Sequence, residues 1–296
     1  MNPASASNGD LKESVRAWLG AAGRYPAVWR LFGVLSFLSK CLAEPRVQAA
    51  KVRAELEDEG YARRISPELT VLHGPFEGLR YASARSTGSA LVPKLLGSYE
   101  DELHGVIGRI LAGDYTDIID IGCAEGYYAV GFGARFPRAT IHAFDTSPRA
   151  QQLCLAMARL NGVAERLELG DFCDEQKLLG LKLGRKALVL SDCEGYEATL
   201  FTARVAAFLA PHDVLIEVHE DPHDPTLSAT LQSRFASTHD VTIVDSIDDK
   251  RKLRGRNFPE LADLDVRTRH RLVREGRQGI MEWLYCTPKR SEAMRS

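Results

Sequence analysis

The sequence lacks the cysteine and charge patterns of disulfide-bonded, zinc-binding or nucleic-acid-binding proteins. Its cysteines form no Cys-x-x-Cys pair, and they lie mostly in apolar segments or at expected strand ends: Cys41, Cys123, Cys154, Cys173, Cys193 and Cys286. This spacing argues against a disulfide framework or a zinc site and indicates the reduced thiols of a cytoplasmic protein. The formal net charge of −2 indicates neither a nucleic-acid-binding surface nor an acidic tail.

Long hydrophobic runs are also lacking. The most apolar N-terminal segment, residues 25–42, is interrupted by Arg30 and Lys40. It is too short and too polar to cross a bilayer, and the small-residue cleavage pattern of a signal peptide does not follow it. We therefore expect no transmembrane segment. The 296 residues, 45% of them hydrophobic, suffice for one large α/β core with an extension.

Short apolar segments recur along the C-terminal two thirds of the chain, separated mostly by helix-like stretches. They span residues 117–121, 139–144, 165–169, 186–191, 212–218, 241–245 and 281–286. Strands that alternate with helices need crossover connections, which predicts an α/β fold with a mostly parallel, Rossmann-like sheet. Upstream, residues 69–81 predict a hairpin-like excursion, and the spacing of residues 91–111 predicts one helix. A further helix is predicted at 265–275, within a charged insertion at 250–279.

The segment Asp117–Tyr127, Asp-Ile-Ile-Asp-Ile-Gly-Cys-Ala-Glu-Gly-Tyr, carries the strongest functional signal. An apolar strand there ends in a turn built on Gly122, Ala124 and Gly126, and a helix-like segment follows. This arrangement lets a nucleotide-like ligand approach bare backbone at a helix N-terminus. A dinucleotide fingerprint would need a small residue where Tyr127 stands, so the spacing disfavours a nicotinamide-dependent oxidoreductase.

With Asp120 two positions before its first glycine, this loop resembles motif I of the class I S-adenosylmethionine (SAM) methyltransferases, with Ala124 replacing the middle glycine. The resemblance implies that Asp120 meets the ammonium group of SAM. The loop residues implied to contact its amino-acid half are Gly122, Cys123, Ala124 and Gly126. In many of these enzymes the helix before the first strand closes over the cofactor, so Tyr99 or Glu100 is expected to line the methionine end.

Acids also follow the next two strands. Asp145 lies nineteen residues after Gly126, where an acid grips the ribose hydroxyls in nucleotide-binding α/β folds. Asp171 and Phe172 follow the third strand. By the same resemblance, this acid faces the adenine amino group and the adjacent apolar side chain packs on the ring.

The ends of the fourth and fifth strands resemble the FkbM-type methyltransferases. Asp192-Cys-Glu-Gly-Tyr-Glu197 matches that family's Asp-x-Glu-Gly-x-Glu ending, and Glu217-Val-His219 matches its Glu-x-His ending. The resemblance covers about residues 117–220, and Ser191 and Cys193 depart from the residues common there. It implies a seven-stranded sheet whose last strand is antiparallel. It also implies methyl transfer from SAM to a hydroxyl of a small molecule, sugar or glycolipid.

The same strand ends carry side chains suited to proton transfer. Asp192, Glu194, Glu217 and His219 lie at the carboxyl ends of central strands, where ligands of open α/β sheets bind. His219 is the expected base, because its pKa lies near working pH, and Glu217 or Asp192 could orient it. Glu194 and Glu197 would also suit the start of a helix, where acids are stabilised by the dipole.

A divalent metal ion is an alternative use of this cluster, with Asp192, Glu217 and His219 as ligands. Because Mg²⁺ favours an oxygen shell, a histidine ligand points to Mn²⁺ or Zn²⁺. Just downstream, His223 and Asp224 fit a turn and a helix cap better than a metal site.

Two other functions stay open at this stage: a nucleotide-cofactor oxidoreductase and a non-catalytic SAM-binding module. An anionic acceptor would suit seven arginines of the insertion, although a solvated helix face explains them as well: Arg251, Arg254, Arg256, Arg267, Arg269, Arg271 and Arg274. A homo-oligomer is left open. The expected organisation is a helical extension at 1–64 that begins with ten disordered residues, a cap segment at 65–111, a SAM-binding domain at 112–289 and a tail at 290–296.

Overall fold

The computed structural model describes residues 26–84, 86, 90–219, 226–277 and 281–289. Contacts divide the chain into two units, residues 1–57 and 58–296. In the first unit the described part belongs to helix α2 (Pro26–Ile65), whose residues 43–49 and 52–57 are exposed. The expectations for residues 1–25, for His223 and Asp224, and for the tail at 290–296 lie outside the described residues. Within the described residues, no helix is long and apolar enough to cross a membrane.

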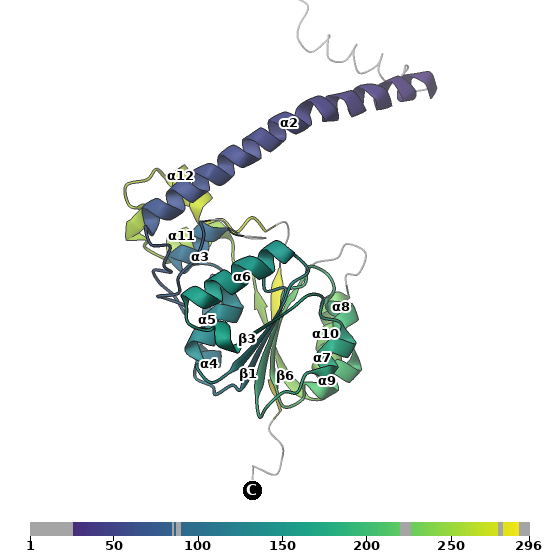
Figure 1. Cartoon of the computed structure of the whole chain (residues 1–296). Helices are drawn as coiled ribbons and strands as arrows, with labels where there is room; N and C mark the ends of the chain where they lie inside the picture. Colours follow the sequence, from purple (N-terminus) through teal and green to yellow (C-terminus); the bar gives the residue numbers. More distant parts are fainter. Residues whose placement is uncertain (1–25, 85, 87–89, 220–225, 278–280, 290–296) are drawn as a thin grey trace, which may run out of the picture. The chain divides into compact units, whose positions relative to one another are not determined.

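A seven-stranded sheet forms the centre of the second unit (Figure 1). In spatial order the strands are β3 (Leu167–Gly170), β2 (Thr140–Phe144), β1 (Asp117–Ile121), β4 (Ala187–Ser191), β5 (Asp213–Val218), β7 (Glu282–Pro288) and β6 (His239–Asp245). The pairs from β3 to β5 are parallel, and β7 is antiparallel to both of its neighbours. The predicted fold class is confirmed, and each strand lies within two residues of its predicted ends.

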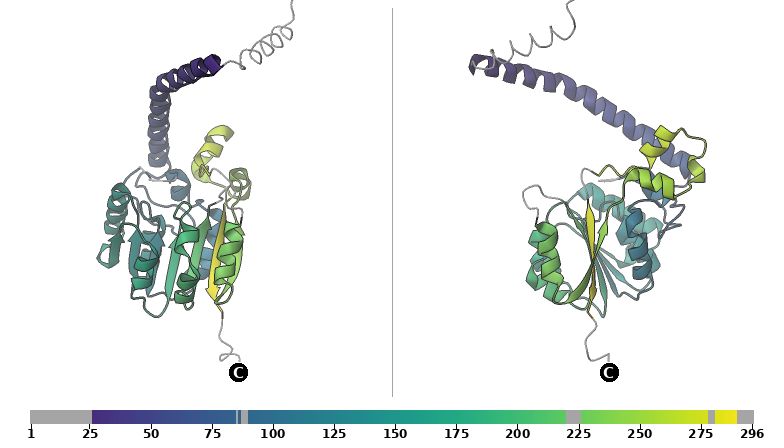
Figure 2. Two further views of the ribbon diagram at one scale, coloured as in Figure 1. Left: turned by 90° about the vertical axis from the view of Figure 1, so that its right-hand side faces the viewer. Right: turned by 180° about the vertical axis from the view of Figure 1, so that it is seen from behind.

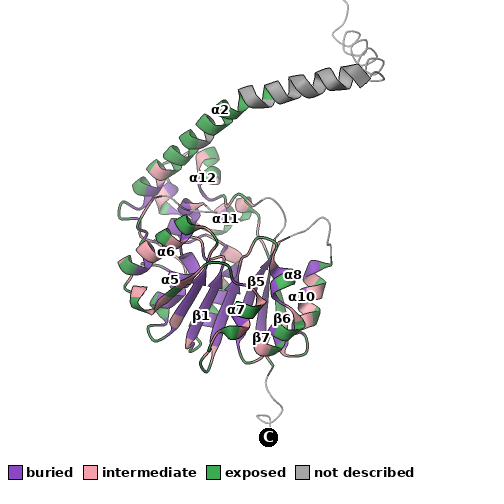
Figure 3. Cartoon of the chain, turned by 45° about the vertical axis from the view of Figure 1, so that its right-hand side comes forward, coloured by how far each residue is buried: buried purple, intermediate pink, exposed green. Residues whose placement is uncertain are grey.

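Helices cover both faces of this sheet (Figures 1 and 2). Successive side chains of a strand point to opposite faces, so Ile118 joins the apolar cluster on one side, whereas Ile119 and Ile121 join the cluster on the other. The first cluster includes residues of α4 (His104–Leu111), α5 (Tyr127–Arg135) and α6 (Pro148–Leu160). The second includes residues of α7 (Glu175–Gly180), α8 (Glu197–Leu200), α9 (Ala203–Phe208) and α10 (Leu227–Phe235). The central strands are consequently buried (Figure 3).

The single helix predicted at residues 91–111 is wrong. The segment consists of α3 (Leu91–Leu96), the 3-10 turn η1 (Asp101–Leu103) and α4. Gly97 ends α3 in the left-handed conformation, with φ of +65°, and a Cβ there would lie 1.8 Å from the carbonyl oxygen of His73. A side chain at this position would clash with that carbonyl, so the residue must be glycine. Its left-handed backbone then ends the helix. Tyr99 and Glu100 therefore lie in a turn and not on a helix.

The insertion before β7 lies beyond the carboxyl ends of the parallel strands (Figure 1). The excursion at 69–81 makes one antiparallel bridge, between Thr70 and Arg80. The insertion before β7 contains α11 (Asp249–Gly255), the 3-10 turn η3 (Pro259–Leu261) and α12 (Val266–Leu272). Asp265 caps α12 by accepting hydrogen bonds from the N–H groups of Arg267 and Thr268, so this helix begins as predicted and ends three residues early. A short 3-10 turn, η2 (Ala164–Arg166), leads into β3.

Candidate functional site

A cavity of about 990 Å³ opens at the carboxyl edge of the sheet, beside β1 and β4, where the strand order reverses. Ile121 is in register with both Phe144 and Ser191, so the loops that follow β1, β2 and β4 leave the sheet at one level. Gly126 does not line the cavity. The predicted residues that do are Tyr99, Glu100, Asp120, Gly122, Cys123, Ala124, Asp145, Asp171, Phe172, Asp192, Glu194, Glu217 and His219.

The glycine loop after β1 has a left-handed backbone at Gly122, Ala124 and Gly126, with φ of +87°, +46° and +96°. A Cβ on Gly122 would lie 1.7 Å from the carbonyl oxygen of Asp192. This glycine is therefore needed where the loop crosses the end of β4, and not only to leave room for a ligand. A Cβ on Gly126 would lie 2.9 Å from Sγ of Cys154 on α6. Gly126 is therefore needed so that α6 can pack closely against the loop.

Asp120 places a buried carboxylate in the cavity wall. The residue is 1% exposed, and neither of its side-chain oxygens makes a hydrogen bond of normal geometry with the described residues. Burial raises the pKa of Asp120 to about 7, although the nearby backbone N–H of Ala129 and the ammonium of Lys94 lower it somewhat. Since buried carboxylates are normally paired, this one is suited to a cationic ligand group.

Asp145 holds the glycine loop from the side of β2. Its Oδ2 accepts a hydrogen bond from the N–H of Ala124 at 2.9 Å, and its Oδ1 accepts one from the N–H of Ser147 at 2.8 Å. Each carboxylate oxygen has two lone pairs, so both can accept a further bond from a ligand hydroxyl. The side chain therefore both orders the loop and presents acceptors to the cavity.

Asp171, Phe172 and Tyr196 line the end of the cavity near β3. Phe172 is about half exposed, and its ring lies 5.0 Å from the ring of Tyr196 at a tilt of 58°. Asp171 is exposed and forms an ion pair with Lys177, which lowers the pKa of Asp171. Two rings beside an acid can hold a flat heterocycle that carries an amino group. Tyr196 was not among the residues predicted from the sequence to line the site.

Tyr99 and Glu100 line the cavity beside the insertion, where the N–H of Glu100 donates a hydrogen bond to Oε1 of Glu275 at 2.8 Å. The Tyr99 ring packs edge-on against Tyr127, with centroids 5.4 Å apart, and Nζ of Lys94 lies 4.7 Å from its centroid. Glu100 accepts a hydrogen bond from the hydroxyl of Tyr128. Burial raises the pKa of Glu100 to about 8, against the opposing effect of the Arg277 guanidinium. Both predicted residues thus reach the cavity from a turn.

His219 is surrounded by carboxylates at the ends of β4 and β5. Its Nδ1 lies 2.6 Å from Oε1 of Glu197, a fully buried side chain. On the other side, its Nε2 lies 3.4 Å from Asp192, 3.5 Å from Glu194 and 3.8 Å from Glu217. Glu197, and not Glu217 or Asp192, therefore orients the ring. From the sequence, the role of Glu197 was open between a helix start and the strand-end cluster; it is both the first residue of α8 and the partner of His219.

These neighbours shift the proton affinities of the cluster. Burial lowers the pKa of His219, but the hydrogen bond and charge of Glu197, with Asp192 and Glu194, outweigh burial and raise it overall. Burial raises the pKa of Glu217 to about 11, and the carboxylates of Glu100 and Asp192 add to this rise. At neutral pH Glu217 is therefore protonated and can donate a hydrogen bond to Asp192.

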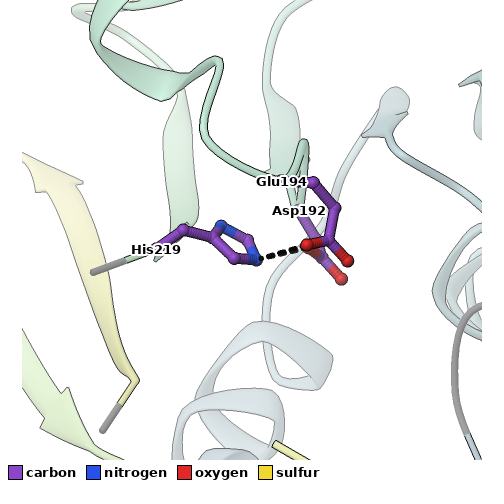
Figure 4. A group of neighbouring side chains, drawn as sticks. All are labelled: Asp192, Glu194 and His219. Carbon is purple, nitrogen blue, oxygen red and sulfur yellow. Dashed lines mark ion pairs between the residues drawn. The ribbon is translucent and has the colours of Figure 1, made fainter. Parts of the chain in front are cut away.

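One oxygen each from Asp192 and Glu194 and one ring nitrogen of His219 lie within 4.8 Å of one another (Figure 4). This group differs from the predicted ligand set by having Glu194 in place of Glu217. Separations of 3.4 and 3.5 Å from Nε2 to the two oxygens suit ligand atoms about 2.1 Å from a tetrahedral ion. The geometry can hold either a proton or a divalent ion.

The insertion closes the cavity on the side of Glu100 through Glu275, Gly276 and Arg277. Arg277 forms ion pairs with Glu102 at 2.6 Å and with Glu275 at 2.9 Å. Sequence reasoning noted the arginines of this region but not Arg277. Of the noted arginines, Arg256 pairs with Asp101, Arg269 binds backbone carbonyls, Arg271 faces Asp58 and Arg274 faces Asp249.

No protein-family model matches the chain, and no curated protein shows significant similarity. Solved structures share parts of the fold at low identity. A SAM-dependent methyltransferase from Geobacter sulfurreducens in complex with S-adenosyl-L-homocysteine is 15% identical, with 64% of this chain and 91% of that chain covered and a TM-score of 0.40.

Two further structures are similar at the same level. Precorrin-6y C5,15-methyltransferase from Geobacter metallireducens is 11% identical over 63% of this chain and 89% of that chain, with a TM-score of 0.42. Geranyl diphosphate C-methyltransferase from Streptomyces coelicolor is 11% identical over 67% and 78%, with a TM-score of 0.39. The strand order of the sheet, with β7 antiparallel between β5 and β6, establishes the fold independently of these similarities.

Proposed function

We propose that this protein is a SAM-dependent methyltransferase that methylates a hydroxyl group, as its resemblance to the FkbM-type enzymes implies. The observation that carries the proposal is the buried carboxylate of Asp120, which lies in the cavity wall without a hydrogen bond of normal geometry to the described residues. The cationic ammonium group of SAM would supply the missing partner. A cavity of about 990 Å³ is also large enough for a cofactor together with an acceptor.

The cavity residues suit the parts of SAM in order. Asp145 has acceptor capacity for the ribose hydroxyls, and the rings of Phe172 and Tyr196 can hold the adenine beside Asp171. Asp120 and Tyr99, which also line the cavity, would face the methionine end. When bound, SAM supplies an electrophilic methyl group on its sulfonium. The protein must then hold the acceptor oxygen in line with it and remove the hydroxyl proton.

His219 is the proposed proton acceptor. Glu197 binds Nδ1, which leaves Nε2 directed towards Asp192 and Glu194 in the cavity. A histidine whose pKa is raised must first lose its own proton to act as a base, so turnover should increase as pH rises through the pKa of His219. Glu197 is a positioning residue in this scheme, because it acts through the imidazole.

A metal-assisted version of the same reaction rests on the ligand group of Asp192, Glu194 and His219. A divalent ion would replace the proton on Nε2, since metal-bound histidine is neutral. One nitrogen and two oxygens favour Mn²⁺ or Zn²⁺ over Mg²⁺. Chelator treatment followed by metal analysis separates the two versions: a bound ion whose removal abolishes turnover supports the metal, whereas full turnover in chelator supports the free imidazole.

The charge of the cavity favours an uncharged or cationic acceptor. Beyond the proposed cofactor region, Asp192 and Glu194 supply most of this negative charge. The other carboxyl groups supply less, because burial raises the pKa of Glu100 to about 8 and that of Glu217 to about 11, and Glu275 is paired with Arg277. Arg277, the arginine that lines the cavity, is already paired with carboxylates. An anionic acceptor, which the arginines of the insertion suggested, would be repelled here.

Isothermal titration calorimetry tests the cofactor assignment. The wild-type protein should bind S-adenosylhomocysteine and should not bind NAD(H). Binding of NAD(H) instead would favour the oxidoreductase. A mass-shift screen of hydroxylated compounds then tests transfer: His219→Ala should keep cofactor affinity and lose about 10²- to 10⁴-fold in turnover. If the protein binds the cofactor but no acceptor gains a methyl group, a non-catalytic SAM-binding module becomes the better description.

A further inference from the structure

Lys94 brings a positive charge to an otherwise apolar, buried helix. All six residues of α3 are buried, and Lys94 itself is 2% exposed. Its ammonium lies over the rings of Tyr99 and Tyr127, 4.7 and 5.4 Å from their centroids, and the residue lines the cavity. Burying a lysine is costly, so a role in the cavity would explain why the charge stands there.

Lys94 is oriented by one carboxylate and has donors left for another. Its Nζ lies 2.5 Å from Oε1 of Glu125, which also accepts a hydrogen bond from the hydroxyl of Ser86 at 2.8 Å. An ammonium group carries three N–H donors. The other cationic groups among the described lining residues are His219 and Arg277. His219 binds Glu197 and lies near further carboxylates, and Arg277 already binds both Glu102 and Glu275.

Asp120 provides the opposite charge in the same cavity. Its carboxylate is buried and makes no hydrogen bond of normal geometry with the described residues. The positive charge of Lys94 lowers the pKa of this carboxyl group, against the larger effect of burial. The wall thus presents one buried anion and one buried cation. An α-amino acid group carries the complementary pair, an ammonium and a carboxylate on one carbon.

We propose that Lys94 binds the carboxylate, and Asp120 the ammonium, of the amino-acid end of the cofactor, with Glu125 holding Lys94 in place. This inference rests on the proposed function and adds a specificity to it: the site selects ligands with an intact α-amino acid group. Decarboxylated S-adenosylhomocysteine, which keeps the ammonium but lacks the carboxylate, should therefore bind more weakly than S-adenosylhomocysteine.

Calorimetric titration of both ligands tests the inference. Wild-type protein should bind S-adenosylhomocysteine about 10- to 100-fold more tightly than the decarboxylated ligand, as expected for loss of a charge-assisted hydrogen bond. Lys94→Met should remove most of this preference by weakening only the first ligand. Lys177→Met is the matched control, since Lys177 pairs with Asp171 at the other end of the cavity, and it should leave the preference unchanged.

A double variant, Lys94→Met with Glu125→Gln, covers the case in which Lys94→Met unfolds, because it also removes the charge of the buried carboxylate that pairs with Lys94. Equal affinity of the wild-type protein for the two ligands would overturn the inference, as would a Lys94 variant that keeps the wild-type preference. In either case binding of S-adenosylhomocysteine would leave the proposed function standing. If neither ligand binds the wild-type protein, the proposed function itself is overturned.

Discussion

Replacing Asp120 by asparagine should stabilise the protein while weakening its binding of S-adenosylhomocysteine. Burial raises the pKa of Asp120 from 3.8 to about 7, so the ionised carboxylate destabilises the folded state. The penalty is absent below the unfolded pKa, grows as pH rises between the two values and is complete above the folded pKa. Because one pH unit corresponds to about 1.4 kcal/mol, the full penalty is about 4 kcal/mol.

The pH dependence is the sharper quantity, because a buried amide without partners has a cost of its own, about 1 to 3 kcal/mol. That cost does not change with pH. The free energy of unfolding of Asp120→Asn relative to wild type should therefore be about 2 to 3 kcal/mol more favourable at pH 8 than at pH 5. Urea unfolding at both pH values measures it, and calorimetry should show weaker binding of S-adenosylhomocysteine by Asp120→Asn.

Asp117→Asn on the same strand is the matched control. Asp117 is also buried, but its Oδ2 accepts hydrogen bonds from the hydroxyl of Thr116 at 2.7 Å and from the N–H of Gly184 at 2.8 Å. Removing its charge should destabilise the protein at both pH values. If Asp120→Asn behaves like this control, or shows no difference between pH 5 and pH 8, the Asp120 carboxylate is not an unpaired charge and the reasoning fails.

Further variants test the loop and the base. Gly122→Ala should destabilise the protein by more than about 3 kcal/mol, because its Cβ would overlap the Asp192 carbonyl. Gly78, with φ of +88° and open space around it, is the control, and Gly78→Ala should cost about 1 kcal/mol. Thermal unfolding of the two variants measures the difference. Glu197→Gln should lower the pKa of His219, measured by NMR titration, and an unchanged pKa would exclude the orienting role. Asp145→Ala should weaken S-adenosylhomocysteine binding by about 2 kcal/mol, and unchanged affinity in calorimetry would remove the ribose assignment.

The central sheet could be predicted from the sequence because its signals are local. The central strands β1, β4 and β5 are short apolar runs bounded by turn residues, and burial on both faces makes those runs nearly continuous. The positions of Gly122, Asp145 and Asp192 followed from the same strands, because parallel strands end at one edge of the sheet. Knowing where the strands end is therefore enough to predict that the residues at those ends line the cavity.

Other features depended on contacts between distant parts of the chain. The residues from Leu91 to Leu111 have helical spacing, but the close approach of Gly97 to the backbone of His73 breaks the helix. The pairing of Lys94 with Glu125 likewise could not be predicted, because no local sequence pattern links the two residues.

The sequence by itself determined the strands, the glycine loop and the acids at the strand ends, since these depend on hydrophobic period and turn chemistry within a few residues. Tertiary structure alone decided that Glu197 orients His219, that Glu194 approaches its Nε2 and that Arg277 returns to the cavity from the insertion. The physical reason is that charge pairing depends on distance in space, and residues far apart in the chain come within a few ångströms only once the sheet has set the positions of its loops.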